Sequence, residues 1–314
     1  MHNYQGRIYM SIAITLLWQI IMMFLLVGVG FVLYRSKKIS AEGSKTLGNI
    51  LIFISLPCVI INGFRVEYSP ERLTGLLISS LAAAVVLLLS VLISTFVFRK
   101  DGIAIFASSF SNPGFFGIPL ILSCVGNDAV FYVASFIAFL NLLQWTYGVF
   151  VMTGQKGALS PAKILKAPFM IAIIIGLILF FSGIPVPDVI AKCLTHLSNL
   201  NTPLAMFTIG VYLAQTDIGA IFKTPRLYLL SAVRLLLIPI LSLLILSLIP
   251  AAHNSLKLAL LITAACPVGS NVAVYAQLHN QDYRYAVQTV VISTLLAVVT
   301  MPLLVQLAVM LWGI

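Results

Sequence analysis

The sequence predicts an all-α protein that crosses a membrane about ten times, in two inverted halves of five helices each. Composition is the first reason, because 61% of the 314 residues are hydrophobic and only 8% are charged, whereas soluble domains carry about 25% charged residues. The second reason is that apolar runs long enough to cross ~30 Å of hydrocarbon recur along the whole chain. The third is that proline-containing segments of the first half recur at a similar spacing in the second half.

The expected spans are separated by short loops that hold most of the charged residues. The first apolar run is too long for a signal peptide and lacks a small-residue cleavage site, so we expect it to be the first span. No stretch between the spans is polar enough to form a soluble domain. The ten spans lie at approximately 12–34, 46–64, 73–98, 103–124, 128–152, 167–184, 195–214, 227–249, 257–278 and 285–312.

The net charge of +10 reflects membrane orientation rather than a nucleic-acid partner, because the positive residues are scattered among short loops. Lys and Arg are retained on the cytoplasmic side. The loops after the odd-numbered spans carry most of them, so we expect both termini to face outward, in a bacterial inner membrane. Those loops hold Arg35, Lys37, Lys38, Lys45, Arg99, Lys100, Lys156, Lys163, Lys166, Lys223, Arg226 and Arg284, and the other side holds Arg7, Arg65, Arg72, Lys192 and Lys257.

Two pairs of prolines indicate an internal repeat. Pro57 and Pro203 are 146 residues apart, and Pro113 and Pro267 are 154 residues apart. Five spans is an odd number, so a second copy must enter the membrane from the opposite side. We therefore expect an inverted repeat, with residues 1–152 as the first half and 153–314 as the second.

The fourth and ninth spans combine proline, glycine and a carboxamide near the middle of the membrane. Proline removes a backbone donor and glycine loosens the helix, and a break in lipid survives only where protein or a water-filled cavity satisfies it. If both helices break and cross, their half-helix N-termini favour an anion. The alternative is that each proline is a simple kink. The expected substrate-binding residues here are Asn112, Pro113, Gly114, Pro267, Gly269 and Asn271.

Other polar residues within the spans are weaker candidates. Asn141 and Gln144 are three residues apart and share one helix face, where they either border the substrate or form interhelical hydrogen bonds. Gln288 has a comparable place in the second half. Ser55 either lines the cavity or satisfies a carbonyl freed by Pro57.

Charged and aromatic residues within the spans leave further alternatives open. Arg234 is either functional or reaches the cytoplasmic interface with its head group. Trp18, Trp145 and Trp312 are expected to be interfacial anchors. The cysteines have no metal-ligand spacing, so we expect no metal site or cofactor. No acidic residue lies deep in a span, so the sequence does not determine whether transport is coupled to H⁺, to Na⁺ or to no ion.

The run Asn112-Pro113-Gly114-Phe115 with Gly117 and Pro119, followed by a polar fifth span, resembles the auxin efflux carrier family, which includes plant PIN-type carriers and bacterial malate or malonate permeases. The resemblance covers essentially the whole chain. It implies ten helices in a five-plus-five inverted repeat, with crossed and broken fourth and ninth helices. It also implies a scaffold of spans 1, 2, 6 and 7, a moving transport domain of spans 3–5 and 8–10, and a homodimer formed through the scaffold.

The sequence therefore predicts a secondary transporter that moves a small organic anion, such as a carboxylate, by alternating access. The alternatives are a channel and a non-transporting sensor or receptor for a similar ligand. An enzyme is not expected, because the chain lacks HExxH and GxSxG motifs and an intramembrane Asp pair.

Overall fold

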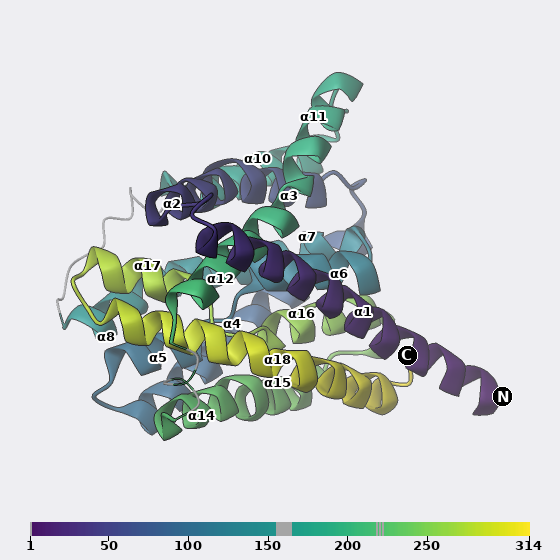
Figure 1. Ribbon diagram of the computed structural model, residues 1–314. Helices are drawn as coiled ribbons and strands as arrows, with labels where there is room; N and C mark the ends of the chain where they lie inside the picture. Colours follow the sequence, from purple (N-terminus) through teal and green to yellow (C-terminus); the bar gives the residue numbers. More distant parts are fainter. Residues whose placement is uncertain (1, 155–164, 218, 220, 222) are drawn as a thin grey trace.

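The computed structural model describes residues 2–154 and 165–314 except 218, 220 and 222, and every regular element in this part of the chain is a helix. Two of the loop lysines counted above, Lys156 and Lys163, lie outside the described residues. Figure 1 shows the helices packed side by side, with both termini at the same end of the bundle.

The helices of the first half run from the N-terminus to residue 153. They are α1 (His2–Arg35), α2 (Ala41–Ile50), η1 (Leu51–Ser55), α3 (Leu56–Gly63), α4 (Pro70–Phe98), α5 (Gly102–Ser109), η2 (Pro113–Gly117), α6 (Ile118–Cys124), α7 (Asp128–Leu143), η3 (Gln144–Gly148) and α8 (Val149–Thr153).

The helices of the second half begin after the gap in the described chain. They are α10 (Pro168–Ser182), α11 (Asp188–Asn199), α12 (Asn201–Gln215), α14 (Pro225–Ala232), η4 (Val233–Leu237), α15 (Ile238–Leu246), η5 (Ala251–His253), α16 (Asn254–Ala265), α17 (Asn271–Leu278) and α18 (Tyr283–Trp312).

Six helical segments among the described residues are long and apolar enough to cross a membrane, and each coincides with an expected span. The four other expected spans are shorter or interrupted: 103–124 is split between α5 and η2–α6, 167–184 is α10, 195–214 falls on α11 and α12, and 257–278 is split between α16 and α17. The long segments are Leu17–Arg35, Glu42–Gly63, Pro70–Phe98, Asp128–Thr153, Pro225–Leu246 and Tyr283–Trp312.

Pro57 and Pro203, the other pair of prolines that indicates a repeat, do not interrupt their helices. Pro57 lies in the first turn of α3, directly after the π-helical turn η1, where the amide of Leu56 bonds the carbonyl of Leu51. The wider turn lets the helix continue through the proline, which lacks a donor. Pro203 lies in the first turn of α12, where a missing N–H costs little. A proline in the sequence thus marked a helix start or a π turn as readily as a gap.

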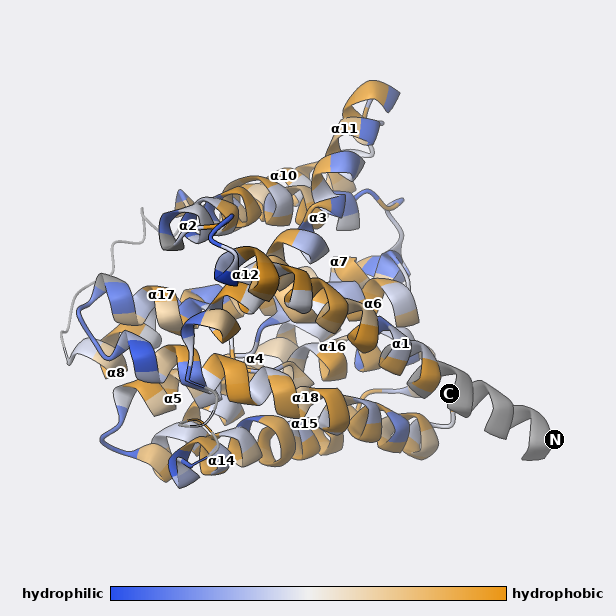
Figure 2. Cartoon of the chain, viewed as in Figure 1, coloured by the Kyte–Doolittle hydropathy of each residue, from blue (hydrophilic) through white to orange (hydrophobic). Residues whose placement is uncertain are grey.

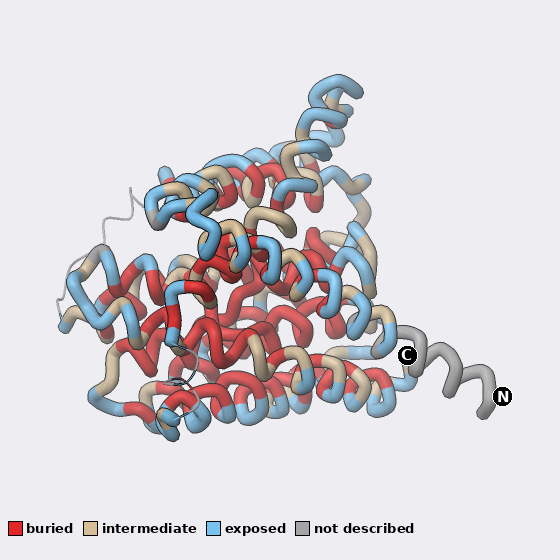
Figure 3. Tube along the Cα trace, viewed as in Figure 1, coloured by how far each residue is buried: buried red, intermediate tan, exposed pale blue. Residues whose placement is uncertain are grey.

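The outward faces of the helices are apolar, as lipid contact requires. On α4, exposed leucines and a phenylalanine recur at helical spacing, from Leu81 at 70% exposure to Phe96 at 73%. Figure 2 shows apolar residues along the outward faces of α1, α10 and α18, with hydrophilic residues gathered in the loops. Figure 3 places the buried residues in the centre of the bundle. Water would not tolerate such a surface, whereas hydrocarbon does.

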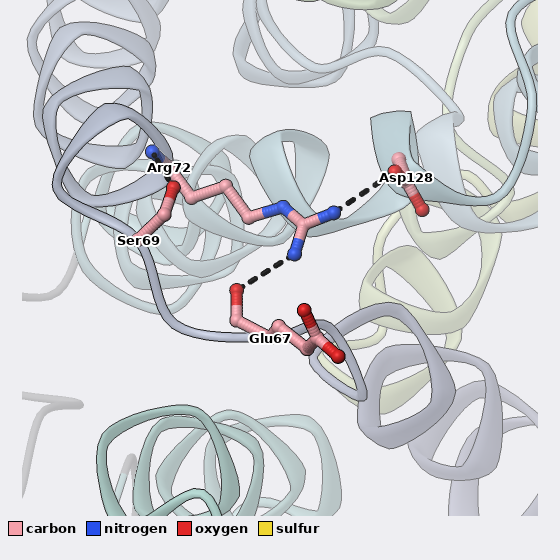
Figure 4. Close-up of polar contacts among 4 residues, drawn as sticks. All are labelled: Glu67, Ser69, Arg72 and Asp128. Atoms are coloured by element: carbon pink, nitrogen blue, oxygen red, sulfur yellow. Dashed lines mark hydrogen bonds and ion pairs between the residues drawn. The ribbon is translucent and has the colours of Figure 1, made fainter.

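Polar contacts tie helix ends together at both ends of α4. At its start, Ser69 caps the helix by accepting from the amide of Arg72 at 3.2 Å, and Arg72 donates to the Glu67 carbonyl at 2.7 Å and to Asp128 of α7 at 3.3 Å (Figure 4). Beyond its end, Asp101 caps α5 by accepting from the Ala104 amide at 2.9 Å. The first set of contacts joins the start of α4 to the start of α7, and the second caps the start of α5.

Helices α1 and α12 approach each other closely through two glycines. A Cβ atom at Gly30 would overlap the carbonyl of Phe207, and one at Gly210 would overlap the carbonyl of Val27. Small residues permit this approach between membrane helices. Helices α2 and α3 pack beside this pair together with α10 and α11, and we call α1, α2, η1, α3 and α10–α12 the α1–α12 group.

We predict that Gly30→Ala lowers the thermal midpoint of the purified protein by about 3–10 °C, since overpacking costs about 1–3 kcal/mol. Gly28→Ala, two residues away on the same helix, is the matched control, because a Cβ there meets nothing within 4 Å. Equal midpoints for the two variants in a detergent-solubilised unfolding scan would contradict the close α1–α12 approach.

Candidate substrate site at the helix crossover

The interruptions of the fourth and ninth expected spans lie against each other. Between α5 and η2, and between α16 and α17, the chain is extended, and Ser111 pairs with Val268 in an isolated antiparallel bridge. The amide of Asn112 donates to the Pro267 carbonyl at 3.0 Å, and the amide of Gly269 donates to the Phe110 carbonyl at 3.0 Å. The predicted meeting of the two broken segments is therefore present, and each break satisfies part of the other's backbone.

Gly269 is required by the closeness of the two backbones. A Cβ atom at this position would lie 2.8 Å from the carbonyl oxygen of Ser111, which is closer than real Cβ contacts allow. The crossover therefore depends on a residue without a side chain at this point.

Two helices begin at the crossover and direct their N-terminal ends toward it. The continuous helix η2–α6 starts at Pro113, and α17 starts at Asn271. The first amides of a helix have no intrahelical acceptor, and the helix dipole adds a partial positive charge there. Asn112 caps η2, since its Oδ1 accepts from the Phe115 amide at 3.3 Å. Its Nδ2 is buried and has no hydrogen-bond partner, so this donor is free for a ligand.

Two helices end at the crossover, and Arg234 covers their C-terminal ends. Its guanidinium donates to the Ser108 and Ser109 carbonyls of α5 at 3.2 Å and 3.4 Å. It also donates to the carbonyls of Ala264 and Cys266 at the end of α16, the latter at 3.1 Å. The side chain is 1% exposed, so the alternative in which it reaches the membrane interface is wrong. The freed carbonyls and partial negative charge of both helices hold it inside.

A cavity of about 190 Å³ lies against the crossover. Asn112, Pro113, Gly114, Gly269 and Asn271 are at its polar wall, together with Asn141 of α7. The rest of the wall is mostly apolar and aromatic, formed by Ser111, Ser270, Ile52, Phe53, Leu56, Phe115, Ile137, Leu140, Trp145, Ala167, Pro168, Phe169, Val274 and Tyr275.

The polar residues of the fifth expected span serve the cavity in different ways. Asn141 is at the wall, and its Nδ2 donates to the Ile137 carbonyl of its own helix at 2.8 Å. Gln144 is fully buried behind the wall, where its Oε1 accepts from Asn271 Nδ2 at 2.9 Å. Gln144 Nε2 is buried without a partner. The structure thus brings Gln144 to the site as a residue that orients Asn271.

Three other predicted site residues lie away from the cavity wall. Ser55 is buried and donates to the Leu197 carbonyl of α11 at 2.9 Å. It therefore joins two helices and does not donate to a carbonyl of its own helix freed by Pro57. Gln288 of α18 is half-buried and is not among the residues that line the described cavities. Pro267 contributes its carbonyl to the crossover but does not line the cavity.

Sequence reasoning missed part of the wall. Trp145, expected as an interfacial anchor with no ligand role, lines the cavity and packs edge-on against Tyr275, with ring centroids 5.5 Å apart. Ser111 and Ser270 also line it, and Ser111 Oγ is buried without a partner. The sequence could have indicated both serines, because each directly precedes an asparagine that was predicted to bind the substrate.

Two larger cavities lie on either side of the central one along α2, η1 and α3. A cavity of about 700 Å³ is lined by Gly48, Asn49 and Ile52, and it shares Ile52 and Val274 with the central cavity. A cavity of about 360 Å³ begins at Val59, further along the same helix, and shares no lining residue with the central one.

A hydrogen bond joins the start of α12 to the crossover. Asn201, buried at the start of α12, donates from Nδ2 to the Gly114 carbonyl at 2.8 Å. Asn201 lies between the α11 residues that line the 360 Å³ cavity and the α12 residues that line the 700 Å³ cavity. The central cavity therefore adjoins the 700 Å³ cavity, with which it shares wall residues, and shares none with the 360 Å³ cavity.

A helical bundle with an apolar outer surface, interrupted helices and an internal cavity defines an integral membrane protein of the transporter class. Comparison with known proteins narrows this. The family model described as membrane transport protein matches residues 15–163 and 157–305. The chain belongs to this family, the auxin efflux carrier family that its sequence resembles.

Two relatives illustrate the similarity. The chain is 25% identical over 292 residues to a Rhizobium meliloti protein named "Putative malonate transporter", with 88% of this chain and 90% of that protein covered. It is 28% identical over 211 residues to an uncharacterized transporter of Methanocaldococcus jannaschii, with 62% and 68% covered.

We predict that Gly269→Ala forces the crossed segments apart, because its Cβ would lie against the Ser111 carbonyl oxygen. The thermal midpoint should fall by about 3–10 °C, and ligand-dependent transport should be lost. Gly28→Ala again serves as the control that adds the same methyl group in open space. A Gly269→Ala protein with normal midpoint and normal flux would show that the two backbones do not approach as described.

Proposed function

We propose that this transporter moves a small organic anion, such as a carboxylate, by alternating access around the crossover. The observation that supports it most directly is the buried, unpartnered Nδ2 of Asn112 at the wall of a cavity where two helices begin. A buried donor without a partner costs free energy, and an anionic ligand would supply its acceptor. The helix ends beside it favour negative charge.

The chemistry of the cavity favours a ligand of low charge. The residues that line it include no Lys, Arg, His, Asp or Glu. The two helix N-termini together supply roughly one positive charge, which matches one carboxylate. The relative named as a malonate transporter supports a carboxylate as the transported group, and the apolar walls accommodate the rest of the molecule.

The residue roles follow from position. Asn112, Pro113, Gly114, Gly269, Asn271 and Asn141 form the ligand-facing wall, while Gln144 and Pro267 hold that wall in place. Ser55 and Gln288 act through helix packing rather than by touching the ligand.

The proposed topology has ten spans in a five-plus-five inverted repeat. The α1–α12 group would be the scaffold and would form a homodimer, and the remaining helices would move against it. The 700 Å³ cavity lies beside the loops that are rich in Lys and Arg, so it would open to the cytoplasm. Both termini would then face outward across the cell membrane.

The orientation can be tested with the native cysteines. Cys193 is exposed on α11, whereas Cys58 and Cys266 are buried. Cys124 is partly buried and is replaced by serine in the test protein. We predict that a membrane-impermeant maleimide added to right-side-out vesicles then labels Cys193 without permeabilisation, and that Cys193→Ser abolishes this labelling. Labelling of Cys193 that requires permeabilisation would reverse the proposed orientation.

The function can be tested in proteoliposomes with a panel of labelled mono- and dicarboxylates. We predict saturable flux of at least one carboxylate, reduced at least tenfold by Asn112→Asp. Aspartate still caps η2 but removes the Nδ2 donor and adds negative charge beside the ligand. Asn280→Asp adds the same charge at an exposed turn after α17 and should transport normally.

Each outcome bears on a separate part of the proposal. Normal flux by Asn112→Asp would remove Asn112 from the binding site. Conductance steps without saturation would indicate a channel, and carboxylate binding without flux would indicate a receptor.

A further inference from the structure

Four backbone carbonyls converge on one buried point beside the crossover. They belong to Ser108 and Ser109 at the end of α5, and to Ala264 and Cys266 at the end of α16, and all four accept from Arg234. Carbonyls from half-helix C-termini are the oxygen ligands with which broken-helix transporters coordinate Na⁺. In this chain a tethered cation already fills that position.

The charge of Arg234 is balanced by helix ends and not by a carboxylate. Among the described residues, the salt bridges are Arg72–Asp128 and Arg226–Asp101, and Arg234 takes part in neither. Two helix C-termini contribute roughly one negative charge in total, which equals the charge of one guanidinium or one Na⁺ ion.

We propose that the guanidinium of Arg234 takes the place of a coupling cation at the crossover, so that the carrier works without Na⁺. The part of this proposal that concerns flux rests on the function proposed above. The part that concerns cation binding does not, because it can be measured on the purified protein without any substrate.

The guanidinium is well suited to this position. Its nitrogens form a planar fork that reaches acceptors on two separate chain segments, whereas a lysine ammonium is a compact point charge. The side chain comes from η4, a π-helical turn within the segment from α14 to α15. The cation is therefore covalently fixed to a third helix and cannot leave during a transport cycle.

The first test compares carboxylate uptake by wild-type proteoliposomes in Na⁺ and in choline at equal ionic strength. The expected ratio of initial rates is about one. Uptake that rises severalfold with Na⁺, or that stops in choline, would overturn the proposal while leaving the carboxylate function intact.

The second test measures thermal midpoints of purified Arg234→Ala in Na⁺, K⁺, guanidinium or choline chloride at equal low concentration. Removing the side chain leaves the four carbonyls without their donor, so we expect a lower midpoint in choline. Na⁺ or guanidinium should raise it by about 5 °C, because a ligand that binds only the folded state stabilises it.

Two proteins serve as controls in the same scan. Wild type and Arg226→Ala, which removes an exposed arginine at the start of α14, should show no difference among the cations. Where Arg234→Ala does not yield folded protein, Arg234→Gln carries the same test, since it removes the charge but keeps an amide donor. If neither variant responds to one cation over choline, the carbonyls do not form a cation site and the proposal fails.

Discussion

The guanidinium of Arg234 makes the crossover possible. Two helices that stop inside a membrane protein leave their last carbonyls without hydrogen-bond donors, because no water is present there. Each unsatisfied carbonyl costs several kcal/mol. Arg234 donates to both helix ends at once. The extended segments between the half-helices satisfy much of the remaining backbone by pairing with each other. On the cavity side, the Nδ2 donor of Asn112 has no hydrogen-bond partner, although the surrounding backbone is largely satisfied.

This arrangement also determines the field inside the cavity. Two positive and two negative helix ends that meet at one place would largely cancel one another. Covering the negative pair with a fixed cation leaves the positive pair, from η2–α6 and α17, to act on the cavity. The proposed anion would therefore be attracted without any basic residue at the wall, which has no charged side chain. A transporter benefits from this, since a direct Arg–carboxylate pair would bind tightly and release slowly.

The sequence predicted the parts of the site that depend on local backbone chemistry. Asn112, Pro113, Gly269 and Asn271 stand where helices stop and start, and their residue types favour such places whatever surrounds them. The role of Arg234 and the position of Trp145 were not predictable in this way, because they depend on which helix face turns inward. Pro57 and Pro203 show the limit of the local rule, since a π turn or a helix start accommodates a proline without a gap.

The three cavities lie along one helical segment. Gly48 lines the 700 Å³ cavity, Ile52 lines both this cavity and the central one, and Val59 lines the 360 Å³ cavity. In the proposed transport cycle a ligand would pass the crossover between these cavities, and the hydrogen bond from Asn201 to the Gly114 carbonyl would lie on the path toward the 360 Å³ cavity. Asn201 belongs to the α1–α12 group, whereas Gly114 belongs to the crossover. Under the proposed alternating access, opening the side of the 360 Å³ cavity would therefore require these two parts to separate. The Oδ1 atom of Asn201 is buried without a partner. This unsatisfied atom destabilises the arrangement in which Asn201 contacts Gly114, and so it lowers the free-energy cost of breaking that contact.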